Sequence, residues 1–520
     1  MQLLEKWKTE SIFWPKKLRL LTEKSNRQTV LNSNTVIPNL VIGSGPTGYA
    51  TALSLLDQGK IVYVIDPTVP LFPTTPLTTP VSAQKALFGS REMYTVSRMA
   101  HLDGKLWGIP YSEVRGGLST TWGAGLQVYP DKYFINWPCK GTGMQPAYQR
   151  ILSEIDHIQM EDALTLKFPW PSGVRKSPPP ESKLGELGNS NITKYSVKEN
   201  ILIGHARLAI SRKGIRECQL CSKCLEGCPY DSIFNSGNEL LRLAATNNRL
   251  HLISGFVQNI RISNVRESNI IIKIVNSSGE LSIINAEHTY LALGAIGTPA
   301  LLLRSGIVNE RVEVRDSQVF YVAFFSFRKL NEVGGISLAK LFVVNKNVGA
   351  DEFHLSLYSP NLDIARRIED KVREIIKVPV RIPKFVTNRI IAGIGFIDPA
   401  FSGKIVMQNK DGKVFLEERK NPKTKEKISE TLSLLSKGLR KIGLFKIPFT
   451  IQIPDVGAGF HSGGGLVDFM TSTTSVFDET GRLRRNSRLI VTDASSMVFN
   501  ITGPHTLTAM AHAYRNVQTK

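Results

Sequence analysis

A glycine turn inside a strand–helix–strand pattern constrains the fold of this chain more than any other feature. Residues 39–66 read as an apolar strand, a G-x-G-x-x-G turn at Gly43, Gly45 and Gly48, a helix and a second apolar strand. In such turns the first glycine makes the tight bend, the second admits a pyrophosphate and the third lets helix and strand pack closely. Asp66 follows Gly43 by 23 residues, near the spacing at which a carboxylate binds ribose hydroxyls and disfavours a 2′-phosphate. The segment predicts a βαβ unit that binds a dinucleotide.

Composition narrows the class of protein. The 520 residues are enough for about three structural units. A content of 42% hydrophobic and 21% charged residues is typical of globular chains and argues against collagen-like, coiled-coil or largely disordered ones. The net charge of +21 favours anionic partners. Because Lys and Arg are dispersed and no aromatic-interleaved basic motif occurs, we expect no nucleic-acid binding.

The sequence also bears on location. No run of about 18 apolar residues occurs, and the N-terminus lacks the apolar core of a secretory signal. We expect a cytoplasmic protein, with peripheral contact at the inner face of the membrane as an option.

Two further regions differ from the βαβ unit in their pattern of apolar and polar residues. After residue 250, strand patterns return, and from 311 to 450 they suit an antiparallel sheet without βαβ rhythm. Within that region a helical repeat places apolar residues on one face and basic residues around it, which is consistent either with a surface helix packed on its own core or with a helix on a membrane surface. The apolar positions are Ile428, Leu432, Leu435, Leu439 and Ile442.

Several ordered segments resemble the glucose–methanol–choline (GMC) oxidoreductases, flavoenzymes that oxidise alcohols. Besides the glycine turn, they are GGLSTTWGAG at 116–125, PDKYFINWP at 130–138, SGFVQNI around Val257, LALGAIGTPALLLRSGI at 291–307, FHSGGGL at 460–466, RLIVTDASSM at 488–497 and GPHTLTAMAHAYRNV at 503–517. The resemblance implies FAD as the dinucleotide. It also implies that Val257 meets the adenine, that Asp493 contacts the flavin, and that a short segment lies beside the isoalloxazine, with Gly117, Ser119, Trp122 and Gly123 as its residues.

We therefore expect an α/β fold with a Rossmann-type FAD-binding domain and a discontinuous substrate domain that has a mainly antiparallel sheet. The expected division is an N-terminal extension (1–35), an FAD-binding domain in three parts (36–130, 241–310 and 451–520), a substrate-side segment and loop (131–200), a four-cysteine insert (201–240) and a substrate-binding domain (311–450).

Two histidines are the candidate catalytic residues. By the resemblance, His461 lies where the family places a histidine that faces the flavin, and His505 lies where relatives have a histidine or an Asn-Pro pair. A neutral imidazole is suited to take the hydroxyl proton of an alcohol as hydride leaves carbon. A shift of one residue would put Pro504 in the place of His505. We expect structural roles for the histidines that lack this setting, which are His101, His157, His205 and His354.

Four of the five cysteines cluster in a C-x2-C-x2-C-x3-C-P run, formed by Cys218, Cys221, Cys224 and Cys228 with Pro229. This spacing is that of the bacterial ferredoxin run, which holds a [4Fe–4S] cluster. Zinc, or a cysteine-rich loop without metal, are the alternatives. The fourth ligand is Cys228 or the distant Cys139, and we favour Cys228 because it needs no long-range coincidence.

Together these features predict an FAD-dependent dehydrogenase that oxidises a hydroxyl of a sugar or related alcohol. Its electrons would leave through the [4Fe–4S] cluster to a one-electron or quinone acceptor. Two alternatives stay open: a metal-free or zinc-containing oxidase that uses oxygen, and a non-catalytic flavoprotein that binds an anionic partner.

Overall fold

The fold was examined in a computed structural model of the chain. It describes residues 36–67, 102–104, 109–120, 122–137, 143–174, 177–189, 200–224, 228–263, 268–276, 279–308, 311–330, 336–347, 351–360, 369, 373, 383–467, 476–498 and 501–518. The predicted N-terminal extension, His101 and Cys139 lie outside these residues.

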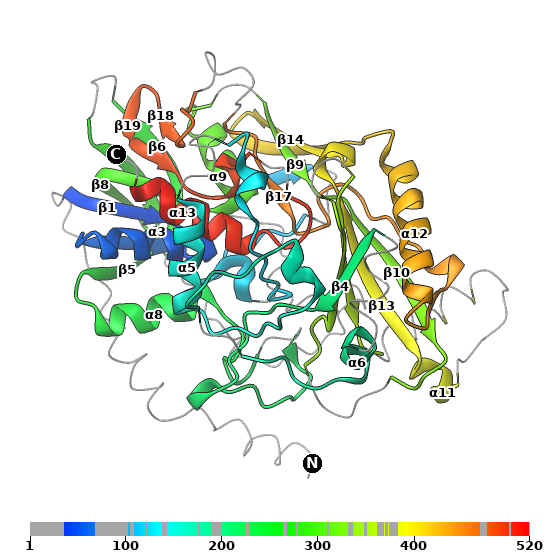
Figure 1. The fold of residues 1–520 in the computed structure, drawn as a ribbon. Coiled ribbons are helices and arrows are strands. Elements are labelled where there is room, and N and C mark those ends of the chain that lie inside the picture. Colours follow the sequence, from blue (N-terminus) through cyan, green and yellow to red (C-terminus); the bar gives the residue numbers. More distant parts are fainter. Residues whose placement is uncertain are drawn as a thin grey trace, which may run out of the picture.

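An eight-stranded sheet forms the nucleotide-binding half (Figure 1). Its strands run in the order β18-β19-β8-β1-β2-β5, with β7 pairing β8 and β6 pairing β7. Neighbours from β19 to β5 are parallel, as expected for apolar strands buried on both faces. The bounds are β1 Val36–Ile42, β2 Val62–Asp66, β5 Leu250–Ser254, β6 Phe256–Ile262, β7 Ile270–Val275, β8 Leu281–Leu291, β18 Arg482–Leu483 and β19 Asn486–Val491.

Helices cover this sheet, and parts distant in sequence meet there (Figure 1). Helix α3 (Pro46–Asp57) lies against the C-terminal helix α13 (Thr506–Gln518). Ser54 donates a hydrogen bond to the carbonyl of Tyr514 at 2.8 Å, and Thr51 donates to Thr492 at 2.9 Å. The C-terminal segment is thereby fixed beside the glycine turn. The other helices of this half are α5 Met144–Glu154, α8 Ser236–Thr246 and α9 Gly294–Arg304.

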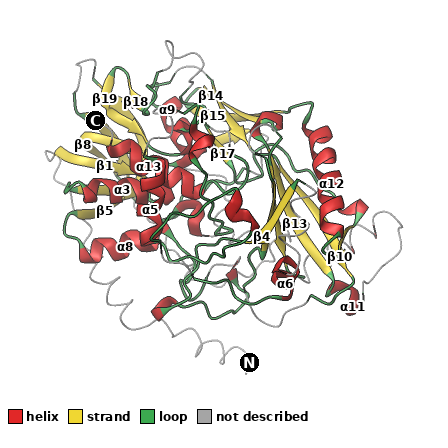
Figure 2. Cartoon of the chain, viewed as in Figure 1, coloured by secondary structure: helices red, strands yellow, loops and turns green. Residues whose placement is uncertain are grey.

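A six-stranded sheet forms the second half, in the order β16-β10-β13-β12-β11-β4, and every neighbouring pair is antiparallel. Figure 2 shows this sheet at an angle to the first. The bounds are β4 Ile201–His205, β10 Val319–Ser326, β11 Leu341–Asn345, β12 Phe353–Tyr358, β13 Ile390–Ile397 and β16 Leu444–Lys446, with the short helices α6 Lys183–Asn189 and α11 Lys384–Thr387 nearby. Residues 201–205, which we had grouped with the cysteine insert, form an edge strand of this sheet.

Helix α12 (Thr424–Arg440) packs on one face of the six-stranded sheet. Its apolar side chains at Ile428, Leu432, Leu435 and Leu439 are buried in the core. The helical repeat therefore belongs to a surface helix packed on its own core, and its apolar face is not available to a membrane.

A five-stranded sheet joins the two halves, in the order β17-β9-β14-β15-β3. Its strands are β3 Leu102–Gly104, β9 Val312–Asp316, β14 Lys404–Lys410, β15 Lys413–Arg419 and β17 Ser462–Gly463. Buried residues of β9, β14 and β15 share one core with α9. The α/β class and the antiparallel second sheet are confirmed. Among the described residues, no helix is long and apolar enough to cross a membrane.

Candidate active site

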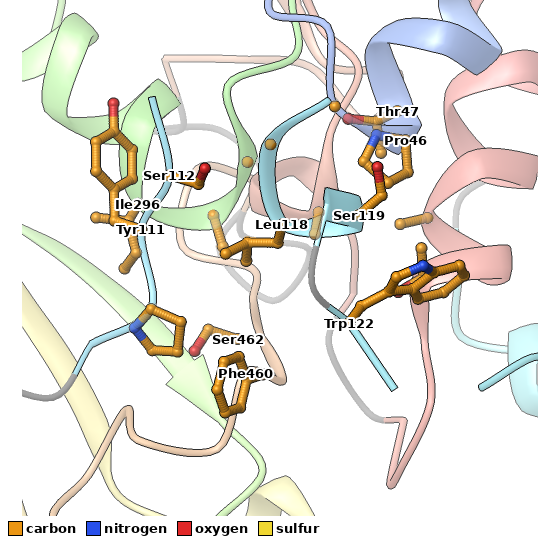
Figure 3. Close-up of a pocket in the computed structure, with 18 of the residues that line it drawn as sticks. Pro46, Thr47, Tyr111, Ser112, Leu118, Ser119, Trp122, Ile296, Phe460 and Ser462 are labelled. Atoms are coloured by element: carbon orange, nitrogen blue, oxygen red, sulfur yellow. The ribbon is translucent and has the colours of Figure 1, made fainter. Parts of the chain in front are cut away.

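A cavity of about 300 Å³ lies between the two halves. Its wall includes nearly all of the predicted cofactor residues and both predicted catalytic histidines; Gly48 lies just behind it. In Figure 3, Pro46 and Thr47 lie on one side of the cavity, Phe460 and Ser462 lie on the other, and Leu118 lies between them.

The glycine turn between β1 and α3 fits a bound phosphate group. A Cβ on Gly48 would overlap the carbonyl oxygen of Gly43, and a Cβ on Gly43 would come within 2.5 Å of the carbonyl oxygen of Ala292. A Cβ on Gly45 would have no protein atom within 4 Å, since this residue borders the cavity. Helix α3 begins there without a side-chain cap, with Pro46 in its first turn. The backbone N–H groups at that end are suited to an anion.

Asp66 ends β2 at the cavity. Its carboxylate accepts a hydrogen bond from Arg115 Nε at 3.3 Å. Burial raises the pKa of Asp66, while Arg115 and Ser44 lower it in part. The sequence prediction included Asp66 but missed Arg115, which places a cation close to the glycine turn.

The segment around Gly117 is fixed against the glycine turn. The backbone N–H of Gly116 donates to Ser44 Oγ at 2.9 Å. Ser119 Oγ donates to the carbonyl of Gly116 at 2.6 Å, and Trp122 Nε1 donates to the carbonyl of Phe234 at 2.9 Å. Thus Gly117, Ser119, Trp122 and Gly123 line the cavity next to the nucleotide side.

Asp493 lies at the start of α9. Its carboxylate accepts from the backbone N–H of Gly294 at 2.9 Å and from Thr298 Oγ1 at 2.5 Å. Burial raises its pKa, and these hydrogen bonds lower it in part. Val257, on β6, lines the same cavity. We call the side formed by the glycine turn, Asp66, residues 116–123, Val257 and Asp493 the nucleotide cradle.

The two predicted catalytic histidines lie together. The ring centroids of His461 and His505 are 5.2 Å apart. The ring of Phe396 packs against His461 with centroids 4.1 Å apart and a tilt of 35°. Burial lowers the pKa of His461 well below its usual value, and His505 and His354 lower it further. Burial also lowers the pKa of His505 to about 4. Both imidazoles are therefore neutral at pH 7 and can accept a proton.

Pro504 and His505 take different places. Pro504 packs against Gly125, where an added Cβ would lie 2.9 Å from its ring. His505, at the start of α13, faces His461. The structure thus brings His505, rather than Pro504, next to His461.

Asp316 holds the turn that carries His461. Its buried carboxylate accepts from the backbone N–H of Gly457 at 2.8 Å and from Ser462 Oγ at 3.4 Å. The neighbouring backbone N–H of Ser317 donates to the carbonyl of His461 at 2.9 Å. Burial raises the pKa of Asp316 to about 6. This carboxylate positions the loop from both sides of His461.

The cavity side opposite the nucleotide cradle is a face of the six-stranded sheet. Its residues, here called the apolar wall, form one packed cluster: Val319, Tyr321, Tyr358, Ile394 and Phe396. Pairing of β10 with β13 sets Val319 opposite Phe396 and Tyr321 opposite Ile394. Among the described lining residues, the Asp, Glu and Arg side chains all lie outside this wall, at Asp66, Glu113, Arg304 and Asp493.

Residues 109–335 match the sequence model of the family described as GMC oxidoreductase. This match supports a GMC oxidoreductase. The structure is similar to that of pyridoxine 4-oxidase from Mesorbium loti, with a TM-score of 0.62, 13% identity and coverage of 93% of this chain and 98% of the other.

A second similar structure is formate oxidase from Aspergillus oryzae RIB40, with a TM-score of 0.58, 13% identity and coverage of 94% of this chain and 98% of the other. A search of curated protein sequences gave no match. At this identity the two structures support the fold, and the family match supports an FAD-dependent oxidoreductase.

The candidate active site contains residues that sequence reasoning missed. His354, for which we expected only a structural role, is buried next to Phe396 and lies close enough to lower the pKa of His461. Asp316 and Phe396 were not singled out. None of the three belongs to a motif, since strand register alone brings them to His461. For Asp316, an acidic residue at the end of a strand with alternating apolar residues, VEVRD, was the signal available.

The cysteine segment lies in a curled loop, and its metal site stays a prediction. Among the described residues, no three Cys, His, Asp or Glu side chains lie close enough to hold a metal ion. None of the four cysteines forms a disulfide bond in the part of the chain that the structure describes. The backbone nevertheless curls between them, with left-handed φ values of 51° at Leu220 and 61° at Ser222. Backbone N–H groups donate to two of the sulfurs, from Ser337 to Cys224 at 3.4 Å and from Ser232 to Cys228 at 3.3 Å.

Proposed function

We propose that this GMC oxidoreductase oxidises the hydroxyl group of a small neutral alcohol, with His461 as the base. The observation that carries the proposal is the position of two neutral imidazoles between the nucleotide cradle and the apolar wall. FAD, when bound, supplies the acceptor for the hydride that leaves the carbon. The alcohol loses that hydride and one proton and becomes a carbonyl compound.

The residues present fit FAD. Gly45 leaves the side of the turn that borders the cavity free of protein atoms. The uncapped start of α3 and the nearby Arg115 suit a pyrophosphate. Asp66 would hold ribose hydroxyls, Val257 would contact the adenine, and the segment from Gly117 to Gly123 with Asp493 would hold the flavin end.

His461 would take the proton of the substrate hydroxyl. Its Nδ1 is buried and has no hydrogen-bond partner among the described residues. An unpaired polar atom of this kind is costly unless a ligand pairs with it. Because the pKa of His461 is lowered, the imidazole is neutral at pH 7 and ready to accept. His505, at 5.2 Å between ring centroids, would orient the same hydroxyl or share the proton.

The test of this role is His461→Ala, with His288→Ala as the control. His288 is partly exposed on β8, away from the cavity. We expect kcat of His461→Ala to fall about 100-fold or more, the usual contribution of a general base, while FAD content stays the same. His288→Ala should match the wild type. Unchanged kcat for His461→Ala would contradict the proposal.

The apolar wall favours a substrate with an apolar body over a sugar. A sugar would bring several hydroxyls against Val319, Ile394 and Phe396, which offer no hydrogen-bonding groups. Within this wall the hydroxyls of Tyr321 and Tyr358 are the only polar side-chain atoms, too few to pair with all of them. Each buried polar group left unpaired costs about 1–3 kcal/mol. An aryl or alkyl alcohol would bury its apolar surface there and present one hydroxyl to His461. We therefore propose a neutral, largely apolar alcohol as the substrate class.

A substrate screen with the FAD-loaded enzyme and a dye acceptor tests this choice. It compares aryl and alkyl alcohols with sugars, linear polyols and quaternary-ammonium alcohols of the same number of heavy atoms. We expect kcat/KM to be about 100-fold higher for the apolar alcohols, from two or more polar groups left unpaired by the others. Preference for a sugar or for the cation would overturn the substrate class but leave alcohol oxidation in place.

Two candidate functions differ in their electron acceptor. The cysteine spacing supports a [4Fe–4S] cluster and a one-electron or quinone acceptor, and the N–H groups that donate to Cys224 and Cys228 suit ligating sulfurs. The alternative is an oxidase without metal. It is supported by the two similar structures, which are both named as oxidases.

Anaerobic purification followed by iron and acid-labile sulfide assays decides between them. About four irons per chain, lost in Cys221→Ser, would establish the cluster. Flavin bands without iron, together with oxygen consumption during alcohol turnover, would establish the oxidase.

A further inference from the structure

An exposed aromatic surface lies at the far end of the six-stranded sheet from the nucleotide-binding half. The side chain of Phe327 is 73% exposed and that of Phe385 is 65% exposed. The ring of Phe327 lies 5.4 Å from Phe325 and 5.2 Å from Phe445, between centroids. We call these four residues the aromatic tip. Figure 1 shows α11, which carries Phe385, at the opposite side of the molecule from β1 and β8.

The aromatic tip is held in place by hydrogen bonds. The guanidinium of Arg389 donates to the carbonyl of Phe327 at 3.3 Å and to the carbonyl of Phe385 at 2.5 Å. The backbone N–H of Ser326 donates to the carbonyl of Arg389 at 2.9 Å. The two exposed rings are thus carried by segments tied to each other. Large rings facing water are costly unless a partner covers them.

Basic side chains surround the aromatic tip. The segments that form it, 323–330, 383–391 and 444–450, contain five basic residues and no Asp or Glu. They are Arg328, Lys329, Lys384, Arg389 and Lys446. Helix α12 ends close by along the chain with Lys437 and Arg440 in its last turn. The tip therefore concentrates part of the net charge of +21 around exposed apolar rings.

We propose that the aromatic tip docks the protein on an anionic lipid bilayer. Phenyl rings enter the boundary between headgroups and acyl chains, while Lys and Arg pair with lipid phosphates. This combination distinguishes a bilayer from an acidic protein, which would match the charge but gain less from protruding rings. The surface is formed by strand ends and α11, so it lies on the membrane without crossing it.

The same face of the sheet links the aromatic tip to the cavity. Alternate residues of a strand share a face, and on β10 these are Val319 and Tyr321 at the apolar wall and Phe325 near the tip. Docking would thus hold this face over the bilayer, where apolar alcohols partition. That link rests on the proposed function, whereas docking itself does not.

Vesicle co-sedimentation of the full-length, FAD-loaded enzyme tests the proposal. The vesicles are pure phosphatidylcholine, or phosphatidylcholine with 30% phosphatidylglycerol. We expect pelleting with the anionic vesicles, at least tenfold weaker binding to the neutral ones, and release by 0.5 M NaCl. The double variant Phe327→Ser/Phe385→Ser should bind the anionic vesicles at least tenfold more weakly, and Lys384→Glu should bind several-fold more weakly.

The matched control is Leu166→Ser. Leu166 is 72% exposed, almost as much as Phe327, but it ends a short helical turn that contacts β4, at the other edge of the sheet. This variant should bind like the wild type, and all variants should keep wild-type kcat on a water-soluble alcohol. Equal binding by wild type and double variant overturns the proposal. So does a failure of wild type to pellet with anionic vesicles at low salt, which would leave an acidic protein as the occupant.

Discussion

Around Gly43, Gly45 and Gly48 the cavity is bounded by bare backbone, whereas across it the boundary consists of side chains from three strands. The nucleotide cradle is built by one local turn and a few hydrogen bonds to Ser44 and Asp493. The apolar wall is built by strand register, which sets residues far apart in sequence opposite each other. At the glycine turn, an added side-chain atom would meet the backbone or occupy space in the cavity. In the apolar wall, one side chain can be exchanged for another with a gradual loss of substrate binding.

This difference explains why one side of the cavity suits the cofactor and the other suits the substrate. A backbone cradle can hold one fixed cofactor, because its donors and its clearance do not depend on side-chain choice. A wall of side chains can change its substrate through substitutions that leave the fold in place. The histidines lie where the two meet, so each is positioned by both halves.

The largest effect should come from the glycine turn. Gly48→Ala would push a Cβ into the carbonyl of Gly43, so the β1–α3 packing must shift. Gly45→Ala meets no protein atom within 4 Å and has a backbone φ of −63° that alanine accepts. We expect both variants to lose FAD, by about tenfold or more in affinity. Only Gly48→Ala should also lower the melting temperature of the FAD-free protein.

Absorbance at 450 nm per chain and thermal unfolding of the FAD-free protein measure these two effects. If Gly45→Ala bound FAD like the wild type, the cradle would not be where we place it.

A smaller effect is expected at the loop of His461. Asp316→Asn keeps the shape of the side chain but removes the charge and one acceptor, so the Gly457 and Ser462 contacts weaken. We expect kcat to fall about tenfold, the loss expected from a hydrogen bond to a charged group, with FAD content unchanged.

The pH profile distinguishes this role from a merely structural one. The pKa of Asp316 is raised to about 6, so its ionised form predominates only above that pH. Wild-type kcat/KM should therefore fall as pH decreases through about 6. The lowered pKa values of His461 and His505 keep both neutral there. Asp316→Asn should show no fall near pH 6; a fall that persists would assign the titration to another group.

The apolar wall should respond in a graded way. Ile394→Thr places a hydroxyl among apolar side chains without a large change in size. We expect kcat/KM for an aryl alcohol to fall about tenfold, the effect of roughly one methylene in a specificity pocket. Ile271→Thr, on β7 and 37% exposed, is the control and should not change kcat/KM. A larger loss on sugars than on aryl alcohols would run against the proposed substrate class.

The last effect concerns stability rather than activity. The pKa of buried His505 is about 4 in the fold and about 6.5 in an unfolded chain. The unfolded state thus binds a proton more readily, and stability is lost as pH falls from 6.5 toward 4. Between pH 7 and 5 the wild type should lose about 2 kcal/mol more than His505→Asn. Urea unfolding at both pH values measures this, and equal losses would indicate that His505 is not neutral in the fold.

Motif-bearing parts of the molecule could be predicted from sequence. The βαβ unit at 39–66 was recognised because its turn and both apolar strands are local. The surface helix at 424–440 followed from a repeat of apolar residues, although only the structure showed which partner its apolar face has. The predicted cysteine cluster stays a prediction: its thiols share a curled loop, and spacing alone does not decide whether the loop holds iron–sulfur, zinc or no metal.

The sequence by itself determined the glycine turn, because a glycine pattern acts through the backbone within a few residues. The two histidines were named by the family resemblance. The tertiary structure decided what faces them. Only the pairing of β10, β12 and β13 brings Phe396 onto His461 and His354 toward the same site. The pairing of β9 with β17 sets Asp316 beside the loop that carries His461. Register depends on the packing of entire sheets, and no short stretch of sequence specifies it.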